Sequence, residues 1–320
     1  MRILVPINGT PESEMSIPLA RQLSSELDGE IYLVRVVVWI EAFGGLRFDP
    51  DILRMIEDAK SYLGELASRF DLPADRTVPL VRYGDNTAKQ IITIAEDEDI
   101  DLIIMGGRCK GWLQRLAKGS VYWGVVRSRV CPVCVVPFPA RRPAGDIAQW
   151  RRREPPMRIL MAVDGSDECE MSLRVAARWV RVLNADVYLL QVIDSSAGTR
   201  GHVHHEPERE GGTEAEVPVM IDKVRTYLRE LASRFKLPAD RTVTLVRCGD
   251  NPAEEITTVA EDEHIDLIVM SSHCRGWLGE LTQGSVCSDV IRSRGCPVLC
   301  VPLPRTEVHR QRWGVLAARR

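Results

Sequence analysis

Two stretches of the chain carry residues whose types and spacing could bind an anion. The first is Asn8-Gly9-Thr10, matched later by Asp164-Gly165-Ser166, and each copy follows a short apolar run. The second runs from Met105-Gly106-Gly107 to Gly119-Ser120, where a helix is expected to begin. Backbone N–H groups at a helix N-terminus, joined by a serine hydroxyl, suit a phosphate, and glycines let the backbone approach it closely.

The two halves of the chain repeat each other. Tyr62 to Phe70 recurs as Tyr227 to Phe235, and both copies continue into Leu-Pro-Ala-Asp-Arg-Thr-Val. Gly119-Ser120-Val121 recurs in the same way as Gly284-Ser285-Val286. A repeat within 320 residues predicts two domains of one fold.

The repeat and the composition set the expected boundaries. We place the first domain at 1–138 and a proline- and arginine-rich linker at 139–156. The second domain follows at 157–304, with a basic tail at 305–320. The second half has additional residues near 195–217, which lack apolar periodicity and are expected to form a surface loop.

Each half alternates short apolar strands with amphipathic helices, the pattern of a parallel sheet covered on both faces. The first half is expected to have strands at 3–7, 31–38, 77–82, 102–105 and 133–136, and helices at 13–27, 51–70, 87–97 and 120–127. Asn86 is expected to cap the third helix. Five strands with right-handed crossovers predict a flavodoxin-like, doubly wound α/β domain in each half. Such sheets bind ligands beyond the carboxyl ends of their strands.

The composition excludes several classes of protein. Hydrophobic residues make up 45% of the chain, charged residues 27%, and the net charge is −3, so we expect a globular protein without a nucleic-acid partner. The apolar runs are shorter than the roughly 20 residues that a membrane span requires. No apolar leader opens the sequence, so a cytoplasmic location is expected.

Most of the nine cysteines lie inside apolar strand patterns and are expected to be buried thiols rather than disulfides. Cys131-Pro132-Val133-Cys134 has the spacing of a redox motif, but it lies in a strand pattern. Its counterpart, Cys296-Pro297-Val298-Leu299-Cys300, has different spacing, which argues against a redox pair.

No arrangement of residues predicts catalysis or a metal site. Nucleophile-elbow and metalloprotease patterns are missing, so the chain is not expected to be an enzyme beyond slow, incidental ATP hydrolysis. His202, His204 and His205 are close in sequence, but they lie in the expected surface loop and are interpreted as solvated side chains.

Taken together, these motifs resemble the universal stress protein family. The residues that carry the resemblance are Asp164-Gly165-Ser166, the turns at Gly84-Asp85-Asn86 and Gly249-Asp250-Asn251, and the Met-Gly loop that leads to Gly-Ser-Val and then Cys-Pro-Val. The resemblance covers nearly the whole chain and implies an adenine nucleotide alpha hydrolase-like version of the doubly wound fold. It also implies pairing through the last strands, 133–136 and 298–301, into an intramolecular pseudodimer, with homodimerisation left open.

The ATP-binding branch of that family has a G-x2-G-x9-G-[ST] loop and an Asp after the first strand. In the first half, Cys109 replaces the second glycine of this loop, and Asn8 replaces the Asp. In the second half, Ser271 and Cys274 replace the first two glycines. A Cβ at those positions restricts positive φ and crowds a phosphate. The first half keeps Gly106 and the flexible Gly106-Gly107 pair, so it is expected to be the better site.

The resemblance implies that an adenine nucleotide, most simply ATP with Mg²⁺, would contact matching positions in the two halves. These positions are Pro6, Asn8, Val36, Met105, Gly106, Arg108, Gly119, Ser120 and Val121 in the first half, and Asp164, Val192, Met270, Ser271, His273, Gly284, Ser285 and Val286 in the second.

Two functional hypotheses follow. The first is a nucleotide-binding sensor or switch in the stress response. The alternative is a stress-related interaction module that binds an unknown protein partner and whose degenerate phosphate loops bind no nucleotide.

Overall fold

The computed structural model describes residues 1–38, 50–107, 121–138, 156–193, 217–272, 286–293 and 295–302. The chain divides into two compact units, Met1–Arg153 and Glu154–Arg320. The predicted tail, residues 139–155 of the predicted linker and the three histidines near 204 lie outside the described residues. Pairing of the units into a pseudodimer stays a prediction.

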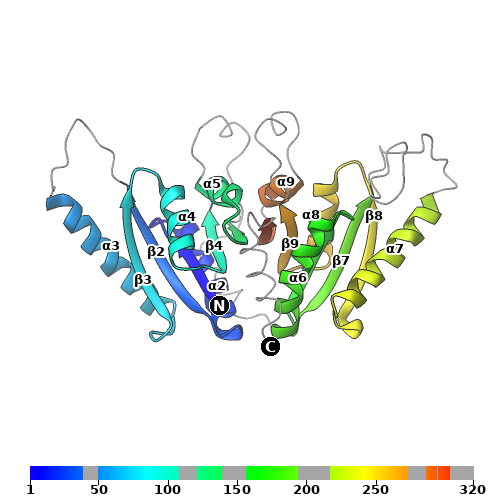
Figure 1. Ribbon diagram of the computed structural model, residues 1–320, viewed down its shortest axis with the longest axis horizontal. Coiled ribbons are helices and arrows are strands. Elements are labelled where there is room, and N and C mark those ends of the chain that lie inside the picture. Colours follow the sequence, from blue (N-terminus) through cyan, green and yellow to red (C-terminus); the bar gives the residue numbers. More distant parts are fainter. Residues whose placement is uncertain are drawn as a thin grey trace. The chain divides into compact units, whose positions relative to one another are not determined.

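The first unit is an α/β domain with a parallel sheet (Figure 1). Its elements are β1 (Arg2–Pro6), α1 (Pro11–Glu14), α2 (Ser16–Glu26), β2 (Glu30–Val38), α3 (Pro50–Arg69), β3 (Thr77–Gly84), α4 (Thr87–Asp97), β4 (Leu102–Gly107), α5 (Val121–Ser128) and β5 (Val133–Pro137). The described strands pair in the order β3-β2-β1-β4-β5, all parallel.

The second unit repeats this arrangement. Its elements are β6 (Arg158–Val163), α6 (Asp167–Val182), β7 (Asp186–Ile193), α7 (Val217–Arg234), the 3₁₀ turn η4 (Ala239–Arg241), β8 (Thr242–Cys248), α8 (Pro252–Asp262), β9 (Leu267–Ser272), α9 (Val286–Ser293) and β10 (Val298–Pro302). The described strands pair in the order β8-β7-β6-β9-β10, again in parallel. The predicted doubly wound α/β fold is confirmed.

The strand order fixes where a ligand can approach each sheet. The chain steps from β1 to β2 to β3 in one direction and then returns to place β4 on the other side of β1. Right-handed crossovers therefore put α2 and α3 on one face and α4 and α5 on the other. The order is 3-2-1-4-5 rather than the 2-1-3-4-5 order of flavodoxin, so the switch point lies between β1 and β4.

The helix expected at 13–27 is divided in two. Helix α1 ends at Glu14 and α2 begins at Ser16. Pro18 cannot donate a backbone hydrogen bond to the carbonyl of Glu14, and its ring crowds that carbonyl. In the second unit Arg174 occupies the equivalent position, and α6 runs unbroken from Asp167 to Val182.

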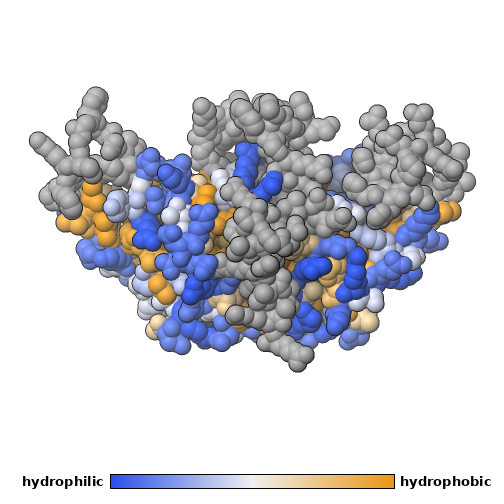
Figure 2. All heavy atoms as spheres, in the orientation of Figure 1, coloured by the Kyte–Doolittle hydropathy of each residue, from blue (hydrophilic) through white to orange (hydrophobic). Residues whose placement is uncertain are grey.

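Apolar residues of the strands form the core of each unit. Ile3, Leu4 and Leu33 are fully buried in the first unit, as are Ile159 and Leu189 in the second. The surface also carries exposed apolar side chains, including Leu53 and Met55 near the start of α3 and Val219 near the start of α7. Figure 2 shows hydrophobic patches among the hydrophilic surface of the described residues.

Candidate functional site

The carboxyl ends of three strands meet at the switch point of each sheet. In the second unit Ala162 at the end of β6 pairs with Met270 of β9 on one side and with Leu190 of β7 on the other. In the first unit β1 likewise pairs with β4 and β2, and the Ile7 amide donates to the Val34 carbonyl at 2.7 Å. The loop after the first strand therefore leaves the sheet where the strand order reverses.

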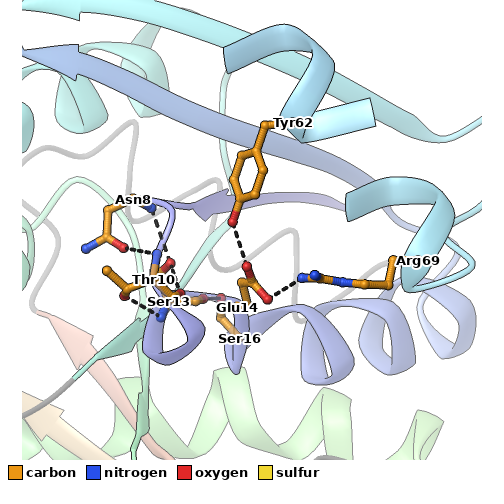
Figure 3. Close-up of polar contacts among 7 residues, drawn as sticks. All are labelled: Asn8, Thr10, Ser13, Glu14, Ser16, Tyr62 and Arg69. Atoms are coloured by element: carbon orange, nitrogen blue, oxygen red, sulfur yellow. Dashed lines mark hydrogen bonds and ion pairs between the residues drawn. The ribbon is translucent and has the colours of Figure 1, made fainter. Parts of the chain in front are cut away.

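In the first unit this loop is a tight turn held by side chains. The amide of Thr10 donates to Asn8 Oδ1 at 3.0 Å, and the Asn8 amide donates to Ser13 Oγ at 3.3 Å (Figure 3). Gly9 has a φ of +89°, in the left-handed region that favours glycine. Thr10 caps α1 by accepting from the Ser13 amide. The turn presents its outward face, with Asn8 exposed, to solvent.

The second unit has the same turn with a carboxylate in place of the amide. Asp164 Oδ1 accepts from the Ser166 amide at 3.0 Å, from Ser166 Oγ at 2.6 Å and from the thiol of Cys169. Gly165 has a φ of +81°. Asp164 therefore holds the turn, as Asn8 does in the first unit, while its side chain stays exposed at the edge of the sheet.

Cys169 is a site residue that sequence reasoning missed. It stands where the first unit has Ser13, and its Sγ accepts from the Asp164 amide at 3.2 Å. Burial, followed by the charge of Asp164, raises the pKa of this thiol to about 11. Comparison of the two copies of the repeat, which align Ser13 with Cys169, could have identified it.

A polar network supports the turn of the first unit from the neighbouring helices. The Tyr62 hydroxyl on α3 donates to Glu14 Oε1 at 2.6 Å, and Arg69 forms an ion pair with the other Glu14 oxygen (Figure 3). Burial and the bond to Glu14 raise the pKa of Tyr62 to about 12. In the second unit Arg234 pairs with Glu170 at 2.5 Å. The network fixes the first helix relative to the third.

Arg35 brings a positive charge beside the turn of the first unit. Its guanidinium carbon lies 4.9 Å from the centre of the Tyr62 ring, a cation–π contact. A Cβ added at Gly9 would lie 3.4 Å from Arg35 Nη2, so the guanidinium lies directly against the glycine. Sequence reasoning missed Arg35, which belongs to no motif.

The second unit has Gln191 where the first has Arg35. Gln191 is buried, and a Cβ at Gly165 would lie 3.7 Å from its Nε2. Among the described residues, no donor reaches Gln191 Oε1. A buried carbonyl oxygen without a donor costs free energy, so this position suits a ligand or a water molecule that donates a hydrogen bond.

Gly106, the first glycine of the predicted loop, is required by packing. A Cβ there would lie 2.3 Å from the backbone oxygen of Glu12, closer than any real contact. The missing side chain therefore lets α1 approach β4. In the second unit Ser271 occupies this place, with its Oγ 3.8 Å from Cys169 Sγ.

The structure places most of the predicted contact residues at this edge. Pro6, Val36 and Val192 are half-buried near strand ends, Met105 and Met270 are buried, and Val121 and Val286 begin α5 and α9. Six predicted contacts lie outside the described residues: Arg108, Gly119, Ser120, His273, Gly284 and Ser285.

Metal ligands, disulfides and membrane-spanning helices were sought in the part of the chain that the structure describes. There, no three His, Cys, Asp or Glu side chains are grouped to hold a metal ion. The seven cysteines of these ranges carry no disulfide. None of the described helices is long and apolar enough to cross a membrane.

Two doubly wound parallel sheets, each with a glycine turn at its switch point, define a tandem α/β protein. The model of the Universal stress protein family matches residues 1–137 and 156–302. The chain therefore belongs to the universal stress protein family, as the sequence motifs indicated.

Individual relatives agree with this assignment. The chain is 29% identical over 159 residues to Universal stress protein MJ0577 of Methanocaldococcus jannaschii, a match that covers 45% of this chain and 93% of that protein. It is 31% identical over 147 residues to Universal stress protein Sll1654 of Synechocystis, covering 45% and 84%. The crystal structure of a universal stress protein from Archaeoglobus fulgidus is similar in fold, with a TM-score of 0.64, 20% identity, and coverage of 95% and 97%.

Proposed function

We propose that this universal stress protein binds an adenine nucleotide, most simply ATP with Mg²⁺, and acts as a nucleotide-dependent sensor or switch in the stress response. The observation that carries the proposal is the turn at the switch point of both sheets. In each unit a left-handed glycine and an exposed Asn or Asp lie beside the end of the fourth strand. Ligands of doubly wound sheets bind at this place.

The side-chain oxygen of Gln191, which no donor among the described residues reaches, supports a ligand at the same edge. An adenine base carries an exocyclic amino group, a donor that could satisfy a buried carbonyl oxygen. In the first unit Arg35 lies at the matching position and provides donors instead. The two units therefore offer different polar groups to a nucleotide.

Electrostatics favours the first unit for an anionic ligand. Asn8 is neutral where Asp164 is negative, and Arg35 is positive where Gln191 is neutral. At these two positions the first unit is therefore more positive by two charges. Charges at the edge of a site still act over the roughly 8 Å Debye length of physiological salt. We propose the first unit as the tighter site for a polyphosphate.

The proposed role is binding rather than catalysis. The titratable groups at the turns are bound to one another: Glu14 by Tyr62 and Arg69, and Asp164 by Ser166 and Cys169. A general base must reach the proton that it removes, and these carboxylates instead hold the fold. Any hydrolysis of bound ATP is proposed to be slow and incidental.

Two measurements on the purified chain test the proposal together: its content of bound nucleotide, and the hydrogen exchange of its backbone amides with and without ATP. Acid-released ligand, identified by chromatography, should contain adenine nucleotide, and added ATP with Mg²⁺ should slow hydrogen exchange of residues 7–10 and 105–107. An empty protein whose exchange is unchanged at millimolar ATP would favour the alternative, an interaction module without a nucleotide.

A further inference from the structure

Two cysteines of the second unit lie in direct contact although they have no motif spacing. Cys287 is the second residue of α9, and Cys300 lies in the middle of β10. Their sulfur atoms are 3.3 Å apart. A disulfide bond is about 2.05 Å long, so the two sulfurs are within about 1.3 Å of bonding distance.

The contact belongs to the second unit alone. In the repeat, Cys287 aligns with Tyr122 and Cys300 with Val135, so the first unit has no thiol at either position. Helix α9 packs against β10, and this packing brings the two sulfurs together. The geometry points to a redox-responsive disulfide between Cys287 and Cys300, formed when the protein meets a peroxide.

The two thiols have different roles in this reaction. Cys300 is almost completely buried, with 1% of its surface exposed, whereas Cys287 is 8% exposed. Cys287 is therefore the sulfur that a small oxidant reaches first, and Cys300 is the resolving thiol.

The reaction balances with one peroxide. The Cys287 sulfur attacks a peroxide oxygen, the O–O bond breaks, and a sulfenic acid and water form. The Cys300 sulfur then attacks the Cys287 sulfur, the S–O bond breaks, and a second water leaves with the thiol proton. The two sulfurs together lose two electrons, which reduce the peroxide, and a dithiol reverses the change.

The disulfide would fix the first turn of α9 against β10. Val286 begins α9 directly after Gly284-Ser285, the predicted phosphate end of the second unit. Oxidation would therefore constrain the start of α9 at Val286, the described residue next to that predicted site. This consequence rests on the proposed nucleotide function, whereas formation of the disulfide does not.

Mass spectrometry of the full chain tests the inference. The protein is treated with hydrogen peroxide, denatured, alkylated with N-ethylmaleimide and digested with trypsin. Cleavage after Arg292 and Arg294 puts Cys287 and Cys300 on separate peptides, while Cys296 shares the peptide of Cys300. We expect a linked pair in which Cys296 is alkylated, two thiols fewer per chain, and full reversal by dithiothreitol.

Variants distinguish this disulfide from general oxidation. In Cys300→Ser, a dimedone adduct should accumulate at Cys287, and Cys287→Ser should abolish the linked peptides. Cys248→Ser, which removes an exposed thiol of the same unit, should leave the linkage unchanged. Peroxide treatment that leaves both Cys287 and Cys300 alkylated in the unmodified sequence, or that links either one to Cys248 instead, would overturn the inference.

Discussion

Gly106 lies so close to the backbone of α1 that a Cβ at this position would be 2.3 Å from the carbonyl oxygen of Glu12. The contact joins the end of β4 to the helix that follows β1, across the switch point of the first sheet. The glycine thus has a packing role that exists without any ligand.

Replacement of Gly106 by Ala should destabilise the first unit by about 1–3 kcal/mol, because the added methyl group must displace backbone atoms. Gly107→Ala is the matched control, since a Cβ there meets no atom within 4 Å. This control should change the free energy of unfolding by no more than about 0.5 kcal/mol. Urea unfolding of the two variants measures the difference, and equal midpoints would show that α1 does not pack as described.

The charge difference between the two turns predicts which unit binds a nucleotide more tightly. Asn8→Asp keeps the oxygen that accepts from the Thr10 amide and changes only the charge. It should weaken ATP binding in the first unit about fivefold, the effect of roughly 1 kcal/mol of electrostatic energy. Competition with a fluorescent ATP analogue at low and high salt measures the change.

The reciprocal variant, Asp164→Asn, should strengthen binding in the second unit by a similar factor, and salt should reduce both effects. If neither variant changes the affinity, the nucleotide binds away from these turns.

Asn86 caps α4 as the sequence predicted, with its Oδ1 accepting from the Lys89 amide at 3.0 Å. Asn86→Ala should lower the free energy of unfolding by about 1 kcal/mol. Asn86→Ser should recover most of this loss, because serine is a comparable N-cap residue. A loss of equal size in both variants would mean that the amide acts through some contact other than the cap.

Tyr62 predicts a pH dependence of stability. Its pKa is raised from 10.0 to about 12 in the folded protein, chiefly by burial and then by the bond to Glu14. As the pH rises, the unfolded chain therefore loses the Tyr62 hydroxyl proton before the folded protein does. The contribution of the protonated hydroxyl to the free energy of unfolding is complete below pH 10 and is lost toward pH 12.

Tyr62→Phe removes both the hydroxyl and its titration. At pH 7 it should cost about 1 kcal/mol, the typical net contribution of a hydrogen bond. The difference in unfolding free energy between the unmodified protein and the variant should shrink as the pH rises from 10 to 12. A difference that stays constant over this interval would contradict the assigned pKa shift.

The fold could be predicted from the sequence because its signals are local. Alternating apolar runs gave the parallel strands, and Asn86 next to a helical pattern gave the cap. The division of the first helix had a local signal too, in Pro18. The apolar spacing of Met15, Leu19 and Leu23 runs across that position and favoured one continuous helix.

The site could be predicted only in part, because its polar contacts join residues that are far apart in sequence. Arg35, Tyr62 and Glu14 come from β2, α3 and α1 and meet only after the helices pack on the sheet. The contact of Cys287 with Cys300 depends in the same way on the packing of α9 against β10. Asn8 and Asp164 could be predicted because a glycine turn that follows an apolar strand can be recognised from a short sequence motif.

Titration calorimetry of the full chain with ATP and Mg²⁺ tests the central claim most directly, with Gly119→Ala and Gly284→Ala as variants that assign any binding to one unit. We predict saturable heat that Gly119→Ala removes or weakens more than Gly284→Ala does. The absence of binding heat at millimolar ATP, from protein shown to be folded and free of nucleotide, would contradict the proposal that this chain is a nucleotide sensor.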